Sequence, residues 1–146
     1  MNSRYIFRGK TEFGEWVYGN LCTADNVTYI AYDNDFYKRE TCGIESLVCD
    51  RYSKVIPETV GQCVGQKDKN GVDIYEGDIL QNVANTNWER QIVKYGYCKS
   101  WVVDDLSNHV ASKKYFKQKK CCYITAADII YEVIGNIHDN PELLED

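Results

Sequence analysis

Short runs of alternating side chains, each ended by turn residues, fill most of this 146-residue sequence. Alternation with a period of two, rich in β-branched and aromatic residues, is typical of half-buried strands. The run from Val27 to Asp33 shows the pattern, with Val27, Tyr29 and Ala31 on one face and Thr28, Ile30 and Tyr32 on the other. No amphipathic helix of ten or more residues stands out, so we expect an all-β fold with little helix.

Further strands are expected wherever this pattern returns between turn signals. The expected segments are 4–9, 14–21, 27–33, 54–56, 59–64, 72–75, a strand that follows the turn at Glu76-Gly77-Asp78, 88–97, 99–106 and 133–138. Residues 126–130 can form a single helical turn, and the final residues "ELLED" form a tail or short terminal helix. Successive short strands with frequent turns indicate a barrel or a sandwich.

Pro57 marks the expected boundary between two lobes. Proline disfavours the helical region for the residue before it, so Lys54–Ile56 should be extended. We expect an N-terminal β lobe over residues 1–57, a C-terminal barrel-like lobe over 58–138, and a tail over 139–146.

The stretch "ETVGQCVGQKDKNGVDIYEGDIL" carries the strongest hairpin signal. Asn70-Gly71 predicts a type I′ turn, which needs positive φ at both central residues. Neither a Gly-x-x-x-x-Gly-Lys-Ser/Thr loop nor a Gly-x-Gly-x-x-Gly motif followed by a helix is present, so Gly61 and Gly65 fit bulges or close backbone approach better than a phosphate loop.

Two segments resemble the signature blocks of the YopX family of phage and prophage proteins. "PETVGQCVGQKDKNGVDIYEGDIL" is similar to a family block that reads TVGQ-x-TG-x-KDKNGK-x-IYEGDI, and "YEVIGNIHDNPELL" is similar to EVIGNIYENPELL. The opening "YIFRGK" followed by "WVYG" is also similar, though less distinctive. The departures are Cys63, where an aromatic residue is common, and His138-Asp139, where Tyr-Glu is common.

The resemblance implies a mainly β protein whose C-terminal part looks like a small SH3-like barrel, and a phage or prophage origin. It supplies no catalytic mechanism, because the matching positions are turn glycines, apolar strand residues and turn carboxylates.

The charge is unevenly distributed along the chain. The net charge is −5 and the pI about 5.1, which argues against a dedicated duplex-DNA binder. Yet one short segment combines five lysines with two aromatic rings, a combination that suits single-stranded nucleic acid. Its residues are Lys113, Lys114, Tyr115, Phe116, Lys117, Lys119 and Lys120. The alternative is a solvated segment, or one docked on an acidic face of a neighbouring copy such as Asp104-Asp105.

Four carboxylates in the first block are the candidates for acid–base or metal chemistry: Asp68, Asp73, Glu76 and Asp78. Paired carboxylates can share acid and base roles, and they also bind Mg²⁺ or Ca²⁺. The competing interpretation makes Asp68 and Asp78 hydrogen-bonded turn residues. Since the strand and turn pattern already explains their spacing, we expect no catalytic residues and no enzyme.

The seven cysteines, at positions 22, 42, 49, 63, 98, 121 and 122, predict neither zinc nor disulfides. Structural zinc sites use closely spaced cysteine pairs, and no C-x₂₋₄-C pair occurs. A Cys–His nucleophile with His109 or His138 stays open, since such partners meet only in space. With no signal peptide and no long apolar run, we expect no metal, no cofactor, no membrane contact and a cytoplasmic location in the bacterial host.

These observations favour a non-enzymatic phage or prophage accessory protein that acts by binding as a homo-oligomer. Exposed β edges must be covered somewhere, and the polarised charge can pair subunits. The alternative is a single-stranded nucleic-acid-binding protein that uses residues 113–120.

Overall fold

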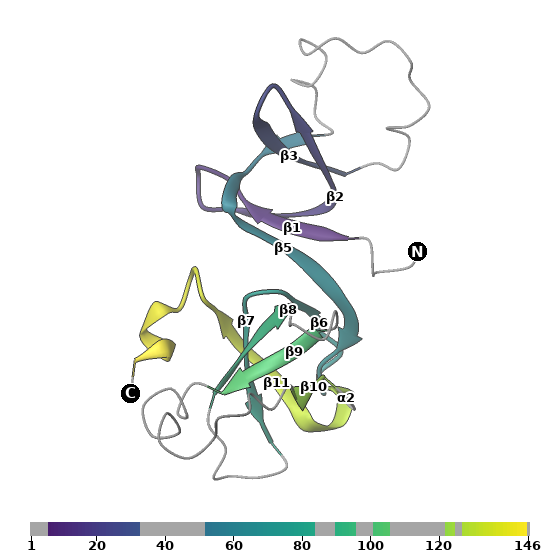
Figure 1. Ribbon diagram of the computed structural model, residues 1–146, viewed down its shortest axis with the longest axis vertical. Coiled ribbons are helices and arrows are strands. Elements are labelled where there is room, and N and C mark those ends of the chain that lie inside the picture. The colour runs from purple at the N-terminus through teal and green to yellow at the C-terminus, as the bar shows by residue number, and fades with distance from the viewer. Residues whose placement is uncertain are drawn as a thin grey trace. The chain divides into compact units, whose positions relative to one another are not determined.

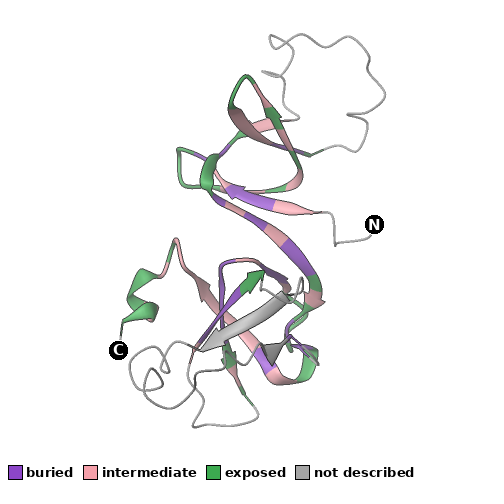
Figure 2. Ribbon diagram, viewed as in Figure 1, coloured by how far each residue is buried: buried purple, intermediate pink, exposed green. Residues whose placement is uncertain are grey.

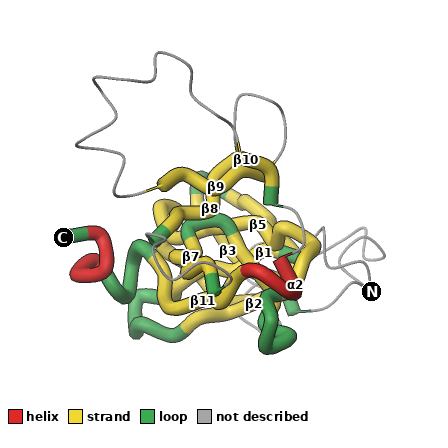
Figure 3. Tube along the Cα trace, turned by 90° about the horizontal axis from the view of Figure 1, so that it is seen from below, coloured by secondary structure: helices red, strands yellow, loops and turns green. Residues whose placement is uncertain are grey.

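The computed structural model describes residues 6–32, 52–83, 90–95, 101–105, 122–124 and 127–145 (Figure 1). Nearly all regular structure in these segments is strand, so the expected all-β class with little helix is confirmed (Figure 3). The chain divides into two compact units, Met1–Cys63 and Val64–Asp146. A division at position 57 stays a prediction; Pro57 itself lies near the start of a long strand.

The first unit is an antiparallel sheet with the strand order β4-β3-β2-β1-β5. Its strands are β1 (Phe7–Lys10), β2 (Trp16–Ala24), β3 (Val27–Ala31), β4 (Tyr52–Lys54) and β5 (Ile56–Lys67), of which the last continues into the second unit. Asp25 and Asn26 join β2 to β3 with φ of 48° and 64°, as a type I′ turn requires. This two-residue loop pairs Ala24 with Val27 and so sets the register of the hairpin.

A bulge in β5 explains how proline fits into this sheet. Arg8 pairs with Gly61 and Lys10 pairs with Ile56, so β5 has extra residues between these two positions. Pro57 falls in the extra segment, where no ladder hydrogen bond needs its missing N–H. The Thr59 hydroxyl holds the bulge, because its Oγ1 accepts from the Lys10 N–H at 2.8 Å and donates to the Ile56 carbonyl at 2.6 Å.

The second unit contains a five-stranded antiparallel sheet with the order β10-β9-β8-β7-β11, and the short strand β6 (Asp73–Tyr75) pairs with the end of β5. The sheet strands are β7 (Asp78–Asn82), β8 (Gln91–Tyr95), β9 (Trp101–Asp105), β10 (Cys122–Tyr123) and β11 (Tyr131–Asn136). Helix α2 (Ala127–Ile130) precedes β11 and agrees with the helical turn expected at residues 126–130. The 3₁₀ helix η5 (Pro141–Leu144) follows β11. The described strands β10 and β11 end the order without pairing with each other, so this sheet is open and the expected SH3-like barrel is not confirmed.

A cluster of buried apolar residues forms the core of the second unit, and Figure 2 colours the buried positions of its ribbon purple. Ile74, Leu80 and Val93 are fully buried at its centre, and each comes from a different strand. Val64, Ile124, Ala127 and Tyr131 complete the cluster. The two segments that carry the family resemblance therefore meet in this core, since β7 pairs with β11 along its whole length.

Candidate functional site

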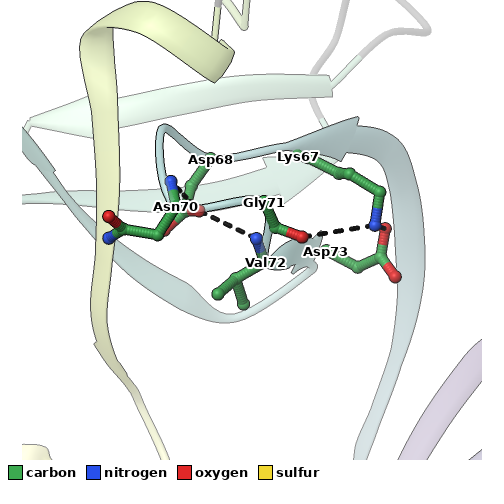
Figure 4. Close-up of polar contacts among 6 residues, drawn as sticks. All are labelled: Lys67, Asp68, Asn70, Gly71, Val72 and Asp73. Atoms are coloured by element: carbon green, nitrogen blue, oxygen red, sulfur yellow. Dashed lines mark hydrogen bonds and ion pairs between the residues drawn. The ribbon is translucent and has the colours of Figure 1, made fainter.

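The Asp68 carboxylate is the centre of the hairpin between β5 and β6 (Figure 4). Its Oδ1 accepts from the backbone N–H groups of Asn70 at 2.8 Å and Val72 at 2.9 Å. The backbone closes the same loop, because the Asp68 N–H donates to the Val72 carbonyl and the Gly71 N–H donates to the Asp68 carbonyl. One side chain therefore holds a loop of three residues.

This loop corrects the predicted turn type. Gly71 has φ of +81°, but Asn70 keeps a negative φ, so Asn70-Gly71 is not a type I′ turn. The hydrogen bonds and the left-handed glycine match the three-residue loop, in which a type I turn precedes a glycine bulge. The hairpin itself is confirmed. Asp68 accounts for the difference between the predicted two-residue turn and the observed three-residue loop. Its carboxylate accepts from two backbone N–H groups of the longer loop and so stabilises it.

The second oxygen of Asp68 reaches a distant part of the chain. Its Oδ2 accepts from the Val133 N–H of β11 at 3.0 Å, and the Lys69 N–H donates to the Tyr131 carbonyl at 3.0 Å. On the same strand, the Asn140 side chain accepts from the Asn136 N–H at 3.3 Å. The Val133 N–H, the Tyr131 carbonyl and the Asn136 N–H of β11 are thus bound within the unit, which hinders pairing of this strand with another chain.

Burial and hydrogen bonding oppose each other at Asp68, which is only 2 % exposed. Burial raises the pKa of its carboxyl, and the three backbone N–H groups together with the charge of Lys69 lower it further than burial raises it. The net pKa is below the ordinary value, so the side chain is a carboxylate at neutral pH. It is held as a structural acceptor.

Ion pairs surround the loop on its exposed side. Lys67 Nζ lies 2.8 Å from an Asp73 oxygen, and Lys69 Nζ lies 2.7 Å from a Glu132 oxygen. The hydrogen bond from Lys69 lowers the pKa of the Glu132 carboxyl below its ordinary value, and a hydrogen bond from the Asn70 amide adds to the effect. These contacts tie the loop to β11 a second time.

The other candidate carboxylates do not join Asp68. Asp78 is 1 % exposed, and its Oδ2 accepts from the Tyr75 N–H at 2.8 Å across the turn from β6 to β7. Asp73 pairs with Lys67, and Glu76 lies in the Tyr75–Asp78 turn. Asp68 and Asp78 are therefore hydrogen-bonded turn residues, as the second interpretation predicts. Within the described segments, no group of three or more His, Cys, Asp or Glu side chains can hold a metal ion.

A second candidate site lies on the first unit. The register of β1 between β2 and β5 places Trp16, Lys10 and Ile56 in one cross-strand row, and Tyr18 and Arg8 in the next. We call these five residues the Trp16 face. The Arg8 guanidinium carbon lies 4.7 Å from the centre of the Trp16 ring, and Lys10 Nζ lies 5.9 Å from it. Alternation predicts that Trp16 and Tyr18 share a face, but the cations beside them depend on strand pairing, which the sequence does not reveal.

The predicted lysine segment, Lys113 to Lys120, lies outside the described residues, as do Cys42, Cys49, Cys98, Cys121 and His109. Of the described thiols, Cys63 is buried and Cys22 is partly buried, and burial raises the pKa of Cys22. A raised pKa disfavours the thiolate form of Cys22. Among the residues placed by the structure, no helix is long and apolar enough to cross a membrane.

Comparison with known proteins finds a family model and solved structures that match the chain. No curated protein matches the sequence. The chain is similar to the crystal structure of protein EF1440 from Enterococcus faecalis, with 27 % sequence identity over 95 % of this chain and 96 % of that chain, and a TM-score of 0.48. The family model described as YopX protein matches residues 6–145, and the two signature blocks lie inside this match. The chain therefore belongs to the YopX family.

Proposed function

We propose that this protein is a phage- or prophage-encoded accessory protein that acts by binding, without catalysis, as a homo-oligomer in the cytoplasm of the bacterial host. Membership of the YopX family supports the phage association. The use of the buried carboxylates supports a role without catalysis: Asp68 and Asp78 both accept from backbone N–H groups inside turns. A general base needs an oxygen within reach of a substrate proton, whereas both oxygens of Asp68 and the Oδ2 of Asp78 accept from the protein's own backbone.

The observation that carries the oligomer is the contrast between sheet edges. Three backbone groups of β11 form hydrogen bonds with Asp68, Lys69 and Asn140. At the ends of the two strand orders, β4 and β10 have no further neighbour among the described strands. An open edge offers backbone groups to a second chain. Pairing with another copy in a closed homo-oligomer would cover this edge without open-ended aggregation.

Light scattering over a range of concentrations tests the oligomer. We expect a mass that is a multiple of 16.9 kDa at high micromolar concentration. Tyr32 is 47 % exposed, and its hydroxyl lies against the Ser53 hydroxyl of β4. Tyr32→Lys places a charge beside this edge and should shift the protein toward monomer.

Tyr95→Lys is the matched control, because Tyr95 is 58 % exposed on the second unit. A wild-type protein that stays monomeric at every concentration contradicts the oligomer. An oligomer that survives Tyr32→Lys contradicts the use of the β4 edge. Association that weakens with salt in the wild type points to paired charges as well.

A second candidate function is single-stranded nucleic-acid binding by Lys113 to Lys120. The concentration of five lysines around Tyr115 and Phe116 favours it. Neutralising these lysines should abolish binding and remove its salt dependence. Wild-type protein that shows no salt-sensitive binding of single-stranded DNA or RNA contradicts it.

A further inference from the structure

We propose that the Trp16 face of the first unit is a binding platform for single-stranded nucleic acid, with bases stacked on Tyr18 and Trp16 and a phosphate beside Lys10. This inference does not depend on the proposed oligomer or on the lysine segment. It rests on the register, exposure and charge of five described residues.

Cross-strand pairing builds the platform from three strands. Lys10 of β1 lies between Trp16 of β2 and Ile56 of β5, and Arg8 lies next to Tyr18 in the neighbouring row. The Thr59 hydroxyl fixes this arrangement, because it accepts from the Lys10 N–H and donates to the Ile56 carbonyl. Sites built on paired strands hold their side chains in place more firmly than sites on loops.

The two aromatic rings of the platform, Trp16 and Tyr18, differ in how firmly they are held and in how exposed they are. Arg8 is only 7 % exposed, and its guanidinium lies over the Trp16 ring, so the cation fixes the ring in one orientation. Tyr18 is 49 % exposed, and Ile56 adds an apolar surface that is 40 % exposed. Aromatic rings on a sheet face stack with unpaired bases of any sequence, because every base has a π-face.

The charge of the platform suits a phosphate chain. Its two charged members, Arg8 and Lys10, are both cations, and the Lys10 ammonium lies over the Trp16 ring, 5.9 Å from its centre. Carboxylates lie around the platform, with Glu12 and Glu15 in the loop between β1 and β2 and Glu58 exposed in the β5 bulge. Duplexes hide their base faces, so the rings favour a single strand. An acidic peptide would use the cations but leave the rings unstacked.

A fluorescence titration with labelled oligo-dT and oligo-rU of about 12 nucleotides, at two salt concentrations, tests the platform. Tyr18→Ala should weaken binding about 5- to 100-fold through the loss of one stacked base. Lys10→Gln should weaken it several-fold and reduce the slope of log affinity against log salt by about 0.7. Glu58→Gln should tighten binding, since it removes a repelling carboxylate and leaves the rings in place.

Tyr95→Ala, which removes an exposed tyrosine of the second unit, is the control and should bind as wild type does. Ultraviolet crosslinking to oligo-dU, with peptide mapping, reads the contact without any substitution, and we expect the crosslink at residues 16–18. Circular dichroism checks that each variant is folded.

Three outcomes overturn the proposal: no salt-sensitive binding by wild type, equal affinities of Tyr18→Ala and Tyr95→Ala, or a crosslink that maps only to residues 113–120. Equal binding of polyglutamate also overturns it, because the face would then recognise protein. None of these outcomes bears on the oligomer, which light scattering measures separately.

Discussion

The two units are both antiparallel β structure, but they are stabilised in different ways. The second unit buries Ile74, Leu80 and Val93 in one apolar cluster. In the described part of the first unit, the buried apolar residues are Ile30, Ala31, Val55 and Cys63, and the polar residues Arg8, Thr11 and Thr59 are buried as well. In the first unit the backbone itself approaches closely, because a side chain at Gly19 would overlap the Ala31 carbonyl oxygen.

The second unit is held together by a packed apolar cluster. The described part of the first unit instead has large apolar and aromatic side chains that are partly exposed, such as Tyr18 and Ile56. The sequence segments with the most distinctive turn residues lie largely in the second unit, where they specify the fold. The Trp16 face lies in the first unit.

The largest expected effect is on the free energy of unfolding, and it compares a core residue of the second unit with an exposed residue of the first. Leu80→Ala should lower the free energy of unfolding by about 2–5 kcal/mol, because it leaves a cavity in a fully packed site. Leu21→Ala in the first unit is the control; Leu21 is 38 % exposed, so its loss should change stability by about 0.5 kcal/mol or less. Urea denaturation measures both. Equal losses would show that the cluster is not the main support of the second unit.

A smaller effect tests the close packing of the first unit. Gly19→Ala should destabilise it by about 1–3 kcal/mol, since the added methyl group meets backbone that cannot rotate away. Hydrogen–deuterium exchange should rise in β2 and β3 before it rises in β7 and β11. Gly9, which faces Val55, should respond in the same direction. Unchanged exchange in β2 and β3 would contradict the role of Gly19.

The smallest expected effect on the free energy of unfolding comes from the Asp68 carboxylate of the second unit. Asp68→Asn should cost about 1–2 kcal/mol at neutral pH, because the amide cannot accept all three N–H groups as the carboxylate does. Folding lowers the pKa of Asp68, so its contribution is present above the ordinary pKa and is lost as the pH falls through the folded value. The difference between wild type and Asp68→Asn should therefore shrink below about pH 4.

Asp73→Asn is the control for this pH series, because the Lys67–Asp73 pair is exposed. Its effect should be small, at about 0–1 kcal/mol. A difference between wild type and Asp68→Asn that stays constant down to pH 2 would show that the carboxylate charge is not what the loop uses.

The strands follow from the sequence because their cause is local. Alternation predicts β2, β3 and β8, and Asp25-Asn26 and Glu76-Gly77 mark turns by their own conformational preferences. Pairing between distant strands has no local signal. The bond from the Val133 N–H to Asp68 joins positions 65 residues apart, and it occupies a backbone group of β11. The expected barrel closure is not confirmed, and the Trp16 face was not predicted, for the same reason: both depend on which distant strands pair.

The pairing of β7 with β11 also constrains how the protein is made. Leu80 lies opposite Val133, so the strand beside β7 is synthesised only after some fifty further residues. The first unit ends at Cys63 and has all its described strand partners much earlier. On the ribosome, the first unit can therefore fold while β7 still waits for its neighbour, and during this interval β7 exposes apolar residues and an unpaired edge. Slow translation before β11 should lengthen this vulnerable interval and promote aggregation.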